Sequence, residues 1–572
     1  MDVTERVKSK PEKEPGSYKQ LRYKIMKAKL IKTSFSSFAL VFLLASCSSS
    51  DDDSDGGGTS SAGDELNLTT YVAIGDSLTA GFADNTLYFD GQINSFPNII
   101  AESFALAGGG EFIQPLVNDN LGGLVAGGAP IAIPGGAADG FLSRLVVLDS
   151  TGAPGPQPGT SVTPVRTTDI APGQAGLVNA DGPFNNLGVP GARIIELASP
   201  ELAMNPFYRR FASNPGVSSV ITDAVADVNR IPTFFTFWAG NNDALGFATS
   251  GGIGEVGPAD PAGPFNKQDI TNPAIFQGAF NGLIDALAPP ENAGIRGVVV
   301  NIPAIEDIPF FTTVPSDSIE LDAATAEAVS AGFEAYNSGI QMALAGGAIT
   351  ANEAANRTIS FTAGNNGVLI LDEGLTDLSS FMLPNLRQAG FADSILLTSA
   401  GSIGVQLDGN PLTTVGVSVP LGVSEDPAAP FDPASLFSPA VNVAADAAVL
   451  TALELQVLEE NVAAYNAIIE ERVAQDSRLA LYDAAADLAD LSDEDGLSFG
   501  TGSISSEFVF GGGFSLDGVH PTATGYAVIA NGIIDTINSE FNAGLLRVDP
   551  NERTRIFFEF PEDADLSAPA TP

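Results

Sequence analysis

Four short runs of β-branched and apolar residues alternate with longer segments of helical periodicity along this chain. The runs cover residues 70–74, 233–239, 297–301 and 478–482. The helical segments include 95–106, 273–287, 323–344, 447–473 and 523–541. Strands that are apolar throughout are buried on both faces, which is typical of a parallel sheet covered by crossover helices. The chain is therefore predicted to be an α/β protein built on a parallel sheet.

The composition agrees with a folded protein and excludes several classes of function. Hydrophobic residues make up 44% of the 572 residues, which is enough for a sizeable core. The formal net charge of −44 opposes nucleic acid as a partner, because phosphate binding needs clustered Lys and Arg. The single Cys and single His exclude an intramolecular disulfide, a Cys-based zinc cluster and a His-rich metal site.

The N-terminus has the pattern of an export signal. Residues 1–32 hold ten Lys and Arg against four acidic residues, and the apolar run 38–45 follows directly. This run is far shorter than the ~20 residues that span a bilayer, so a permanent transmembrane helix is not expected. The run ends in Leu44-Ala45-Ser46-Cys47, which resembles a bacterial lipobox whose cysteine becomes lipidated. The alternative is that Cys47 is a buried free cysteine. If translation starts at Met26, residues 1–25 are an over-extended gene start.

A stretch rich in Ser, Asp and Gly follows Cys47 and extends to about residue 65. Such residues bury no apolar area, so a flexible tether is expected. Its composition resembles the leaders of surface-displayed bacterial lipoproteins, with a plain spacer as the alternative. The protein is thus predicted to be exported and held by a lipid in the bacterial outer membrane, either facing inward or displayed on the cell surface.

Polar residues follow the first apolar run in the order Gly75-Asp76-Ser77-Leu78. A strand that ends at Gly75 and turns sharply places Ser77 at the carboxyl edge of the sheet, where open α/β sheets bind ligands. A helix that begins there directs its free N–H groups and positive dipole end at Ser77 and a developing anion. The alternative is that Asp76 or Ser77 only caps a helix.

Two further motifs could supply hydrogen-bond donors to an anion. Gly191, at the end of Asn186-Leu-Gly-Val-Pro-Gly191, can turn its backbone N–H toward a substrate oxygen because it has no side chain. The run 233–239 leads into Gly240-Asn241-Asn242-Asp243, whose neutral amides suit an oxyanion. Simple turns are the alternative reading of both motifs.

The only histidine of the chain, His520, lies directly before Pro521, where a helix is expected to begin. Asp517, three residues earlier, can accept a hydrogen bond from Nδ1–H and leave Nε2 free as a base. The alternative is a helix cap with a surface histidine. Because no other imidazole exists, any histidine-dependent chemistry of this chain depends on His520.

Together, the four motifs resemble those of the GDSL, or SGNH, hydrolase family of esterases and lipases. Ser77 matches the nucleophile of Gly-Asp-Ser-Leu, and Gly191 matches the second-block glycine. Asn242 matches the oxyanion asparagine of Gly-x-Asn-Asp, while Asp517 and His520 match Asp-x-x-His. The motifs occur in the family's order. The fold implied by the resemblance is a flavodoxin-like three-layer α/β/α sandwich with a parallel sheet and long insertions.

The resemblance implies a lipase or carbohydrate esterase with no metal and no organic cofactor. His520 would take the proton from Ser77 as it attacks an ester carbonyl, and Asp517 would hold the imidazole tautomer. The N–H groups of Ser77 and Gly191 and the amide of Asn242 would form the oxyanion hole. The partner implied is an ester substrate, and lipid, phospholipid and acetylated polysaccharide all remain open; oligomeric state is not predicted.

Two other functions remain open. One is a non-catalytic surface lipoprotein that binds glycan or protein through its long inserts. It is disfavoured because binding members of such families usually lose a catalytic residue, and all are present here. The other is an acyltransferase that uses the same site with an alcohol as acceptor, which only product analysis separates from hydrolysis.

These expectations divide the chain into parts: a signal peptide (1–46), a tether (47–65), a hydrolase domain (66–545) and an acidic tail (546–572) that frays from residue 549. Two insertions, at about 108–185 and 312–445, exceed the length of compact family members. The first is rich in Gly and Pro and is expected to be a long decorated loop. The second is too apolar for a linker, and part of it is predicted to roof the site and set acyl-chain or sugar selectivity.

Overall fold

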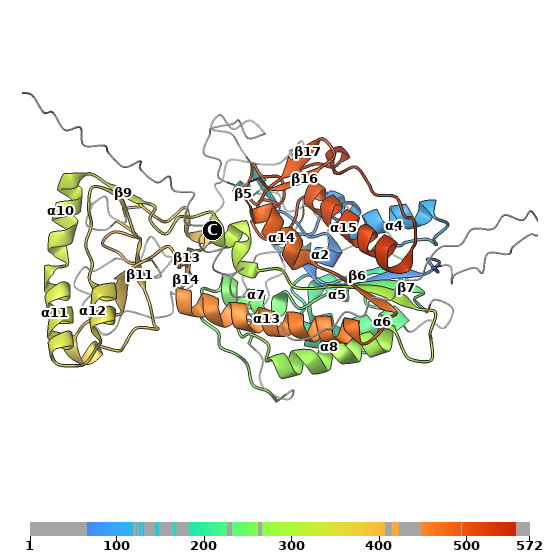
Figure 1. The fold of residues 1–572 in the computed structure, drawn as a ribbon, viewed down its shortest axis with the longest axis horizontal. Helices are drawn as coiled ribbons and strands as arrows, with labels where there is room; N and C mark the ends of the chain where they lie inside the picture. Colours follow the sequence, from blue (N-terminus) through green and yellow to red (C-terminus); the bar gives the residue numbers. More distant parts are fainter. Residues whose placement is uncertain are drawn as a thin grey trace, which may run out of the picture. The chain divides into compact units, whose positions relative to one another are not determined.

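The computed structural model describes most of the chain after residue 65 (Figure 1). The described residues are 66–117, 120, 122, 125–126, 129–130, 144–147, 164–166, 182–225, 231–260, 266–406, 414–421, 448–493 and 495–555. They belong to the second of two units, which spans Asp64–Pro572. The predicted signal peptide, Cys47 and the tether lie outside the described residues.

Five parallel strands form the central sheet, in the order β15-β8-β7-β1-β6. Their bounds are β1 (Tyr71–Gly75), β6 (Asn186–Gly188), β7 (Phe234–Trp238), β8 (Arg296–Val300) and β15 (Leu479–Tyr482). The predicted α/β class and parallel sheet are therefore confirmed, and four of the strands lie where the sequence indicates. The fifth, β6, was not predicted, because only three residues pair there and Gly188 and Pro190 obscure the pattern.

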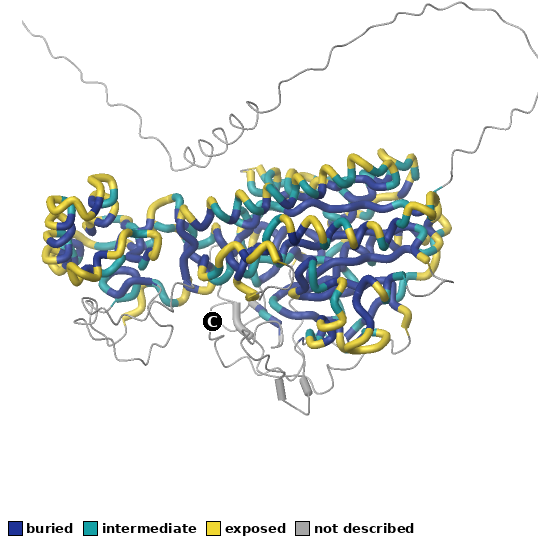
Figure 2. The backbone as a smooth tube through the Cα atoms, turned by 90° about the horizontal axis from the view of Figure 1, so that it is seen from below, coloured by how far each residue is buried: buried dark blue, intermediate teal, exposed yellow. Residues whose placement is uncertain are grey.

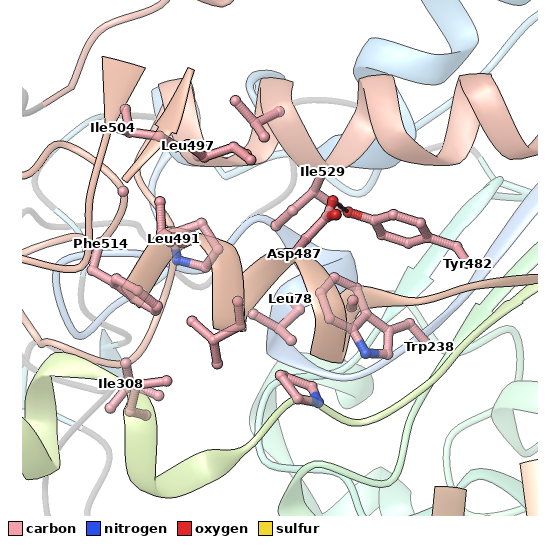
Figure 3. Close-up of a pocket in the computed structure, with 18 residues that line it drawn as sticks. Leu78, Trp238, Ile308, Tyr482, Asp487, Leu491, Leu497, Ile504, Phe514 and Ile529 are labelled. Atoms are coloured by element: carbon pink, nitrogen blue, oxygen red, sulfur yellow. Dashed lines mark hydrogen bonds between the residues drawn. The ribbon is translucent and has the colours of Figure 1, made fainter. Parts of the chain in front are cut away.

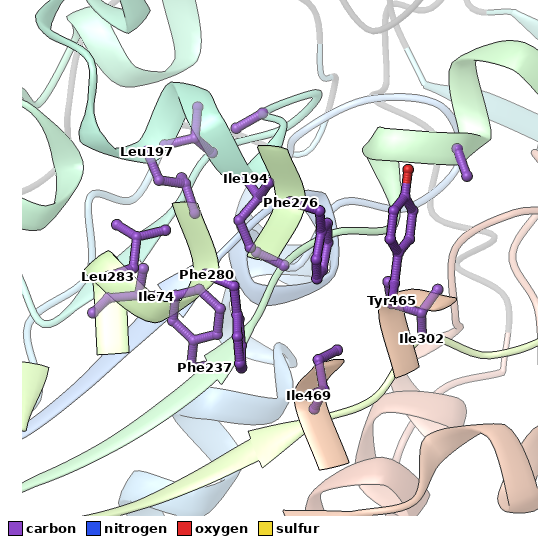
Figure 4. Packing of buried hydrophobic residues seen from close by; sticks show 14 of the residues in the cluster. Ile74, Ile194, Leu197, Phe237, Phe276, Phe280, Leu283, Ile302, Tyr465 and Ile469 are labelled. Carbon is purple, nitrogen blue, oxygen red and sulfur yellow. The ribbon is translucent and has the colours of Figure 1, made fainter. Parts of the chain in front are cut away.

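Alternate residues of the strands enter two different cores, one on each face of the sheet. Ile74, Phe237 and Val299 pack on the face covered by α8 (Pro273–Leu287) and α13 (Ala452–Ala474). Figure 4 shows Phe276 and Phe280 of α8 and Tyr465 of α13 meeting there, and the rings of Phe276 and Tyr465 stack with centroids 4.2 Å apart.

The opposite face of the sheet packs against α4 (Phe96–Leu106) and α15 (Ala523–Phe541). Ala73, Phe234 and Val300 point toward these two helices, whose buried residues include Phe104 and Ile533. All residues of the strands are accordingly buried except Arg296 of β8 and Leu481 of β15, which are half-buried, and Figure 2 shows this dark core of the tube. This two-sided burial explains why the strands read as continuous apolar runs.

Most predicted helices have nearly the expected bounds, with two differences. The segment 323–344 is not one helix but two, α10 (Ala323–Gly332) and α11 (Glu334–Ala345), which meet at Phe333. Gly332 precedes that break, and glycine is costly in a helix interior. Helix α13 begins at Ala452 rather than at residue 447, because Thr451 and Glu454 form a capping box.

Shorter elements connect these parts. The helices are α2 (Ser77–Ala80), α3 (Phe89–Ile93), α5 (Pro206–Arg209), α6 (Val220–Val225), α7 (Asn242–Thr249), α9 (Pro309–Thr312), α12 (Ala351–Arg357) and α14 (Ala484–Ser492). The 3₁₀ turns are η1 (Ile194–Ala198), η2 (Pro200–Met204), η3 (Ile305–Asp307), η4 (Ser379–Phe381), η5 (Leu397–Ser399) and η8 (Pro550–Glu552). No helix within the described ranges is long and apolar enough to cross a membrane.

The second insertion builds a hydrophobic core of its own. Helices α10, α11 and α12 pack against two antiparallel strand pairs. In the first pair β9 (Ile319–Leu321) bonds to β10 (Gly364–Asn366), and in the second β11 (Leu369–Leu371) bonds to β12 (Leu386–Gln388). Tyr336 and Ile340 are fully buried in this core. The segment returns through β13 (Ser394–Ile395), which pairs with β14 (Val449–Leu450) directly before α13. Residues 422–447 lie outside the described part.

Most of the first insertion also lies outside the described residues, so the prediction of a long loop there is not tested. Its described residues include two short antiparallel strand pairs. The first joins β2 (Val125–Ala126) to β3 (Ala129–Pro130), and the second joins β4 (Leu145–Val147) to β5 (Pro164–Arg166). The hairpin β16 (Leu497–Phe499) with β17 (Gly502–Ile504) precedes α15.

The prediction that the tail frays from Asp549 is wrong for its first residues. Val548 donates its N–H to Asn531 of α15, and Arg553 forms an ion pair of 2.7 Å with Glu102 of α4. These contacts bind residues 548–553 to the two helices on that face of the sheet. Residues 556–572 lie outside the described part.

Candidate active site

Strand β1 leads directly into the turn that holds Ser77. A Cβ at Gly75 would lie 2.1 Å from the carbonyl oxygen of Trp238, so only glycine allows β1 and β7 to approach at this point. Asp76 caps α2, accepting a hydrogen bond of 3.0 Å from the N–H of Leu78. Ser77 is the first residue of that helix and is 7% exposed. The predicted strand–turn–helix arrangement is therefore present.

Ser77, His520 and Asp517 form one continuous chain of hydrogen bonds. Nε2 of His520 lies 2.9 Å from Oγ of Ser77, and Nδ1 of His520 lies 2.9 Å from Oδ2 of Asp517. The other carboxylate oxygen of Asp517 accepts from the backbone N–H groups of Val519 and His520, at 2.9 and 2.8 Å. The structure thus brings together three residues that the motifs singled out, and their distances suit proton transfer.

The environment of Asp517 favours its charged form. Burial by itself would raise the pKa, but the nearby His520 charge and the hydrogen bonds from His520 and Val519 lower the Asp517 pKa to about 2. The carboxylate is therefore ionised at neutral pH and can stabilise a positive charge on the imidazole. Gly518, at φ +71°, makes the turn between Asp517 and His520, and its carbonyl accepts from Phe310.

A loop just after the Ser77 helix holds the Asp517 segment in place. Asp84 and Asn85 both have left-handed backbone angles, with φ of 51° and 61°. Asp84 Oδ1 accepts from the N–H of Leu516 at 3.0 Å, and the Asp84 N–H donates to Ser515 Oγ at 3.0 Å. Sequence reasoning missed these contacts. Their only signal is the short Asp-Asn pair, which tolerates left-handed backbone.

Gly191 and Asn242, the two other predicted donors, belong to loops that are bonded to each other. Gly191 follows β6 with φ +75° and is exposed, and Asn242 begins α7 after β7. The Asn242 amide donates to the carbonyl of Ala192 at 3.1 Å. The carboxylate of Asp243 accepts from the N–H of Ile194 at 2.8 Å. Because β6, β1 and β7 are neighbouring parallel strands, these loops and Ser77 share one edge of the sheet.

The adjacent asparagine has a different position. Asn241 is buried, and its amide donates to Oδ2 of Asp76 at 2.9 Å. Burial raises the pKa of Asp76 to about 6, although the bonds from Asn241 and Leu78 lower it. Asn241 therefore connects the end of β7 to the turn that holds Ser77, while Asn242 is partly exposed. The resemblance singled out the partly exposed asparagine, Asn242, but did not indicate what Asn241 binds.

No described residues form a group of three or more His, Cys, Asp or Glu side chains that could hold a metal ion. Compared with protein-family models, with curated proteins and with solved structures, the chain matches none of them. The class of site is thus defined by geometry alone. A serine, an imidazole and a carboxylate are hydrogen-bonded one to the next at the carboxyl edge of a parallel sheet.

Proposed function

We propose that this protein is a serine hydrolase of the GDSL, or SGNH, type that cleaves carboxylic ester bonds. The observation that carries the proposal is the hydrogen-bonded chain from Ser77 Oγ through His520 to the Asp517 carboxylate. The sheet topology supports it. Numbered along the chain, the five strands lie in the order 2-1-3-4-5, which is the flavodoxin-like order that binds ligands at the carboxyl edge.

The reaction follows from these positions. Ser77 Oγ attacks the carbonyl carbon while its proton moves to Nε2 of His520, and Asp517 stabilises the imidazolium through Nδ1–H. The tetrahedral intermediate collapses, and the leaving alcohol takes the proton from Nε2. Water then attacks the acyl-serine with His520 again as base, which releases the carboxylic acid and restores Ser77.

The negative oxygen of the tetrahedral intermediate needs donors on the side of β6 and β7. The N–H of Ser77 at the start of α2, the N–H of Gly191 and the second amide hydrogen of Asn242 are the proposed donors. The Asn242 amide is already oriented by its bond to Ala192, so little reorganisation is needed during the reaction.

A covalent probe and an aryl acetate test the proposal on the full-length chain. An alkyl fluorophosphonate should form a phosphorus–oxygen bond with Ser77 and release fluoride. Both labelling and aryl acetate hydrolysis should fall by about 10⁴-fold in Ser77→Ala and His520→Ala. Ser539→Ala is the matched control, because Ser539 is an exposed serine on α15. Hydrolysis near the wild-type rate in His520→Ala would overturn the assignment, since the chain has no other histidine.

We further propose that Cys47 carries a lipid that anchors the enzyme in the outer membrane. Support comes from the sequence, where the only cysteine directly follows a signal-like apolar run. Wild-type protein should sediment with membranes, and Cys47→Ser should keep its signal and lose metabolic labelling with palmitate. Soluble, unlabelled wild-type protein would contradict this.

A further inference from the structure

A cavity of about 100 Å³, whose lining residues are drawn in Figure 3, is bordered by residues next to Ser77 and His520 in the chain. Leu78, the residue after Ser77, forms part of its wall, and so do Val519 and Pro521, which flank His520. The remaining walls come from the ends of β7, β8 and β15, from α14 and α15, and from the β16–β17 hairpin. The cavity is therefore lined by the chain neighbours of both reacting residues, although Ser77 and His520 themselves are not part of its wall.

The lining of this cavity is almost entirely apolar. Leu491, Leu497, Phe514 and Ile529 point into it in Figure 3. Its main polar side chains satisfy each other, because the Tyr482 hydroxyl donates to Oδ2 of Asp487 at 2.5 Å. A sugar would leave its hydroxyl groups without hydrogen-bond partners in such a site, whereas a hydrocarbon chain has no hydrogen bonds to lose.

We infer that this cavity binds the acyl chain of the ester and sets a preference for short chains. The inference rests on the proposed hydrolase function and names its substrate class. An engineered apolar cavity of ~150 Å³ holds benzene with its six carbons, so about 100 Å³ accommodates roughly four. Esters of about four to five acyl carbons are thus the best substrates.

The position of the cavity also changes the expected source of selectivity. Its described lining residues lie at positions 78–308 and 482–529, and the insertion at 312–445 contributes none of them. The insertion does reach the catalytic loop, since a Cβ at Gly518 would lie 2.9 Å from Leu397. It therefore supports the Asp517–His520 turn, while α14, α15 and the β16–β17 hairpin select the acyl chain.

A chain-length series tests the inference on the full-length enzyme. From acetate to butanoate, kcat/KM should rise about fourfold per methylene and then level off. Leu491→Ala should move the plateau to longer chains by about two carbons, and Leu491→Phe should lower the butanoate-to-acetate ratio by roughly tenfold. Leu453→Phe is the matched control, because Leu453 is 61% exposed on α13 and should leave the series unchanged.

The only tryptophan of the chain, Trp238, lines the cavity and gives a readout that needs no turnover. Ethyl butanoate should shift the emission of Ser77→Ala protein to shorter wavelength in a saturable way, and Leu491→Phe should abolish the shift. Ser77-dependent turnover with no chain-length effect and no emission change would overturn the cavity assignment and leave the hydrolase intact. Absence of Ser77-dependent turnover for every ester would overturn both.

Discussion

The backbone N–H of Asn85 donates a hydrogen bond of 2.8 Å to Oδ2 of Asp517, the same oxygen that bonds to Nδ1 of His520. The donor lies only eight positions after Ser77, whereas Asp517 lies 432 residues further along the chain. The segment that carries Ser77 therefore also orients the carboxylate of Asp517. The neighbouring Asp84 accepts a hydrogen bond from the N–H of Leu516, which adds a second contact between these two segments.

Removal of the Asp84 side chain should weaken turnover without preventing binding. We expect Asp84→Ala to lower kcat by about 10- to 100-fold with little change in KM, because the Asp517–His520 turn loses a fixed contact. Asp84→Asn keeps an oxygen that can accept from Leu516 and should restore most of the rate. Steady-state kinetics of the two variants decide this, and equal losses in both would show that the charge matters rather than the hydrogen bond.

The two adjacent asparagines should have separable roles. Asn242→Ala should lower kcat by about 10²- to 10³-fold and leave the melting temperature unchanged, because Asn242 is a partly exposed donor to the intermediate. Asn241→Ala should cost about 1–3 kcal/mol of stability, because the buried Asp76 loses a donor. Kinetics and thermal unfolding of both variants check this; a stable, fully active Asn242→Ala protein would remove Asn242 from the oxyanion hole.

Folding stability should decrease between about pH 4 and pH 7. Burial raises the pKa of Asp243 from 3.8 to about 7, and the hydrogen bond from Ile194 offsets only part of this. Since the folded pKa exceeds the unfolded one, the folded protein binds this proton more tightly. Its contribution is complete below the unfolded pKa and is lost as the pH rises through the folded pKa, with a magnitude on the order of 4 kcal/mol.

Thermal unfolding of Asp243→Asn across this pH range measures that contribution. The variant lacks the titrating group, so its melting temperature should fall less steeply than that of the wild type. Charge repulsion among the other acidic residues affects both proteins equally, so it cancels when their melting temperatures are subtracted. Parallel slopes would show that Asp243 is ionised in the folded protein throughout.

The core of the second insertion should depend on one buried cation. Arg387 lies 2.5 Å from Asp372 and 2.6 Å from Asp393, and all three side chains are no more than 7% exposed. Arg387→Ala leaves two buried carboxylates unpaired and should cost about 3–5 kcal/mol. The exposed pair of Arg547 with Asp535 is the matched control, and Arg547→Ala should cost less than about 1 kcal/mol. Urea unfolding of both variants gives the comparison.

Local patterns in the sequence predicted the strands and helices, because interactions between neighbouring residues largely determine where these elements form. The apolar run before Gly75 is visible as a strand signal and lies where expected. The helix expected to begin at Pro521 begins two residues later, at Ala523, because the Thr522 side chain caps it by accepting from the N–H of Gly525. Contacts between distant segments were not visible. Nothing in the residues near Asp84 indicates that its side chain bonds to Leu516. The hydrophobic periodicity of residues 312–445 likewise does not show whether their apolar side chains form a separate core or cover the site. The cavity is likewise formed by side chains from six different segments, each of which reads only as part of a core.

The bond between Ser77 and His520 joins residues 443 positions apart. A ribosome makes the first of them early and the second almost at the end. For about half of its synthesis, from Asn242 to His520, the chain holds Ser77 and the Gly191 and Asn242 loops but has no imidazole anywhere. On the proposed mechanism, a nascent chain, or one cut short by a nonsense mutation before residue 520, lacks the base that Ser77 needs to attack an ester.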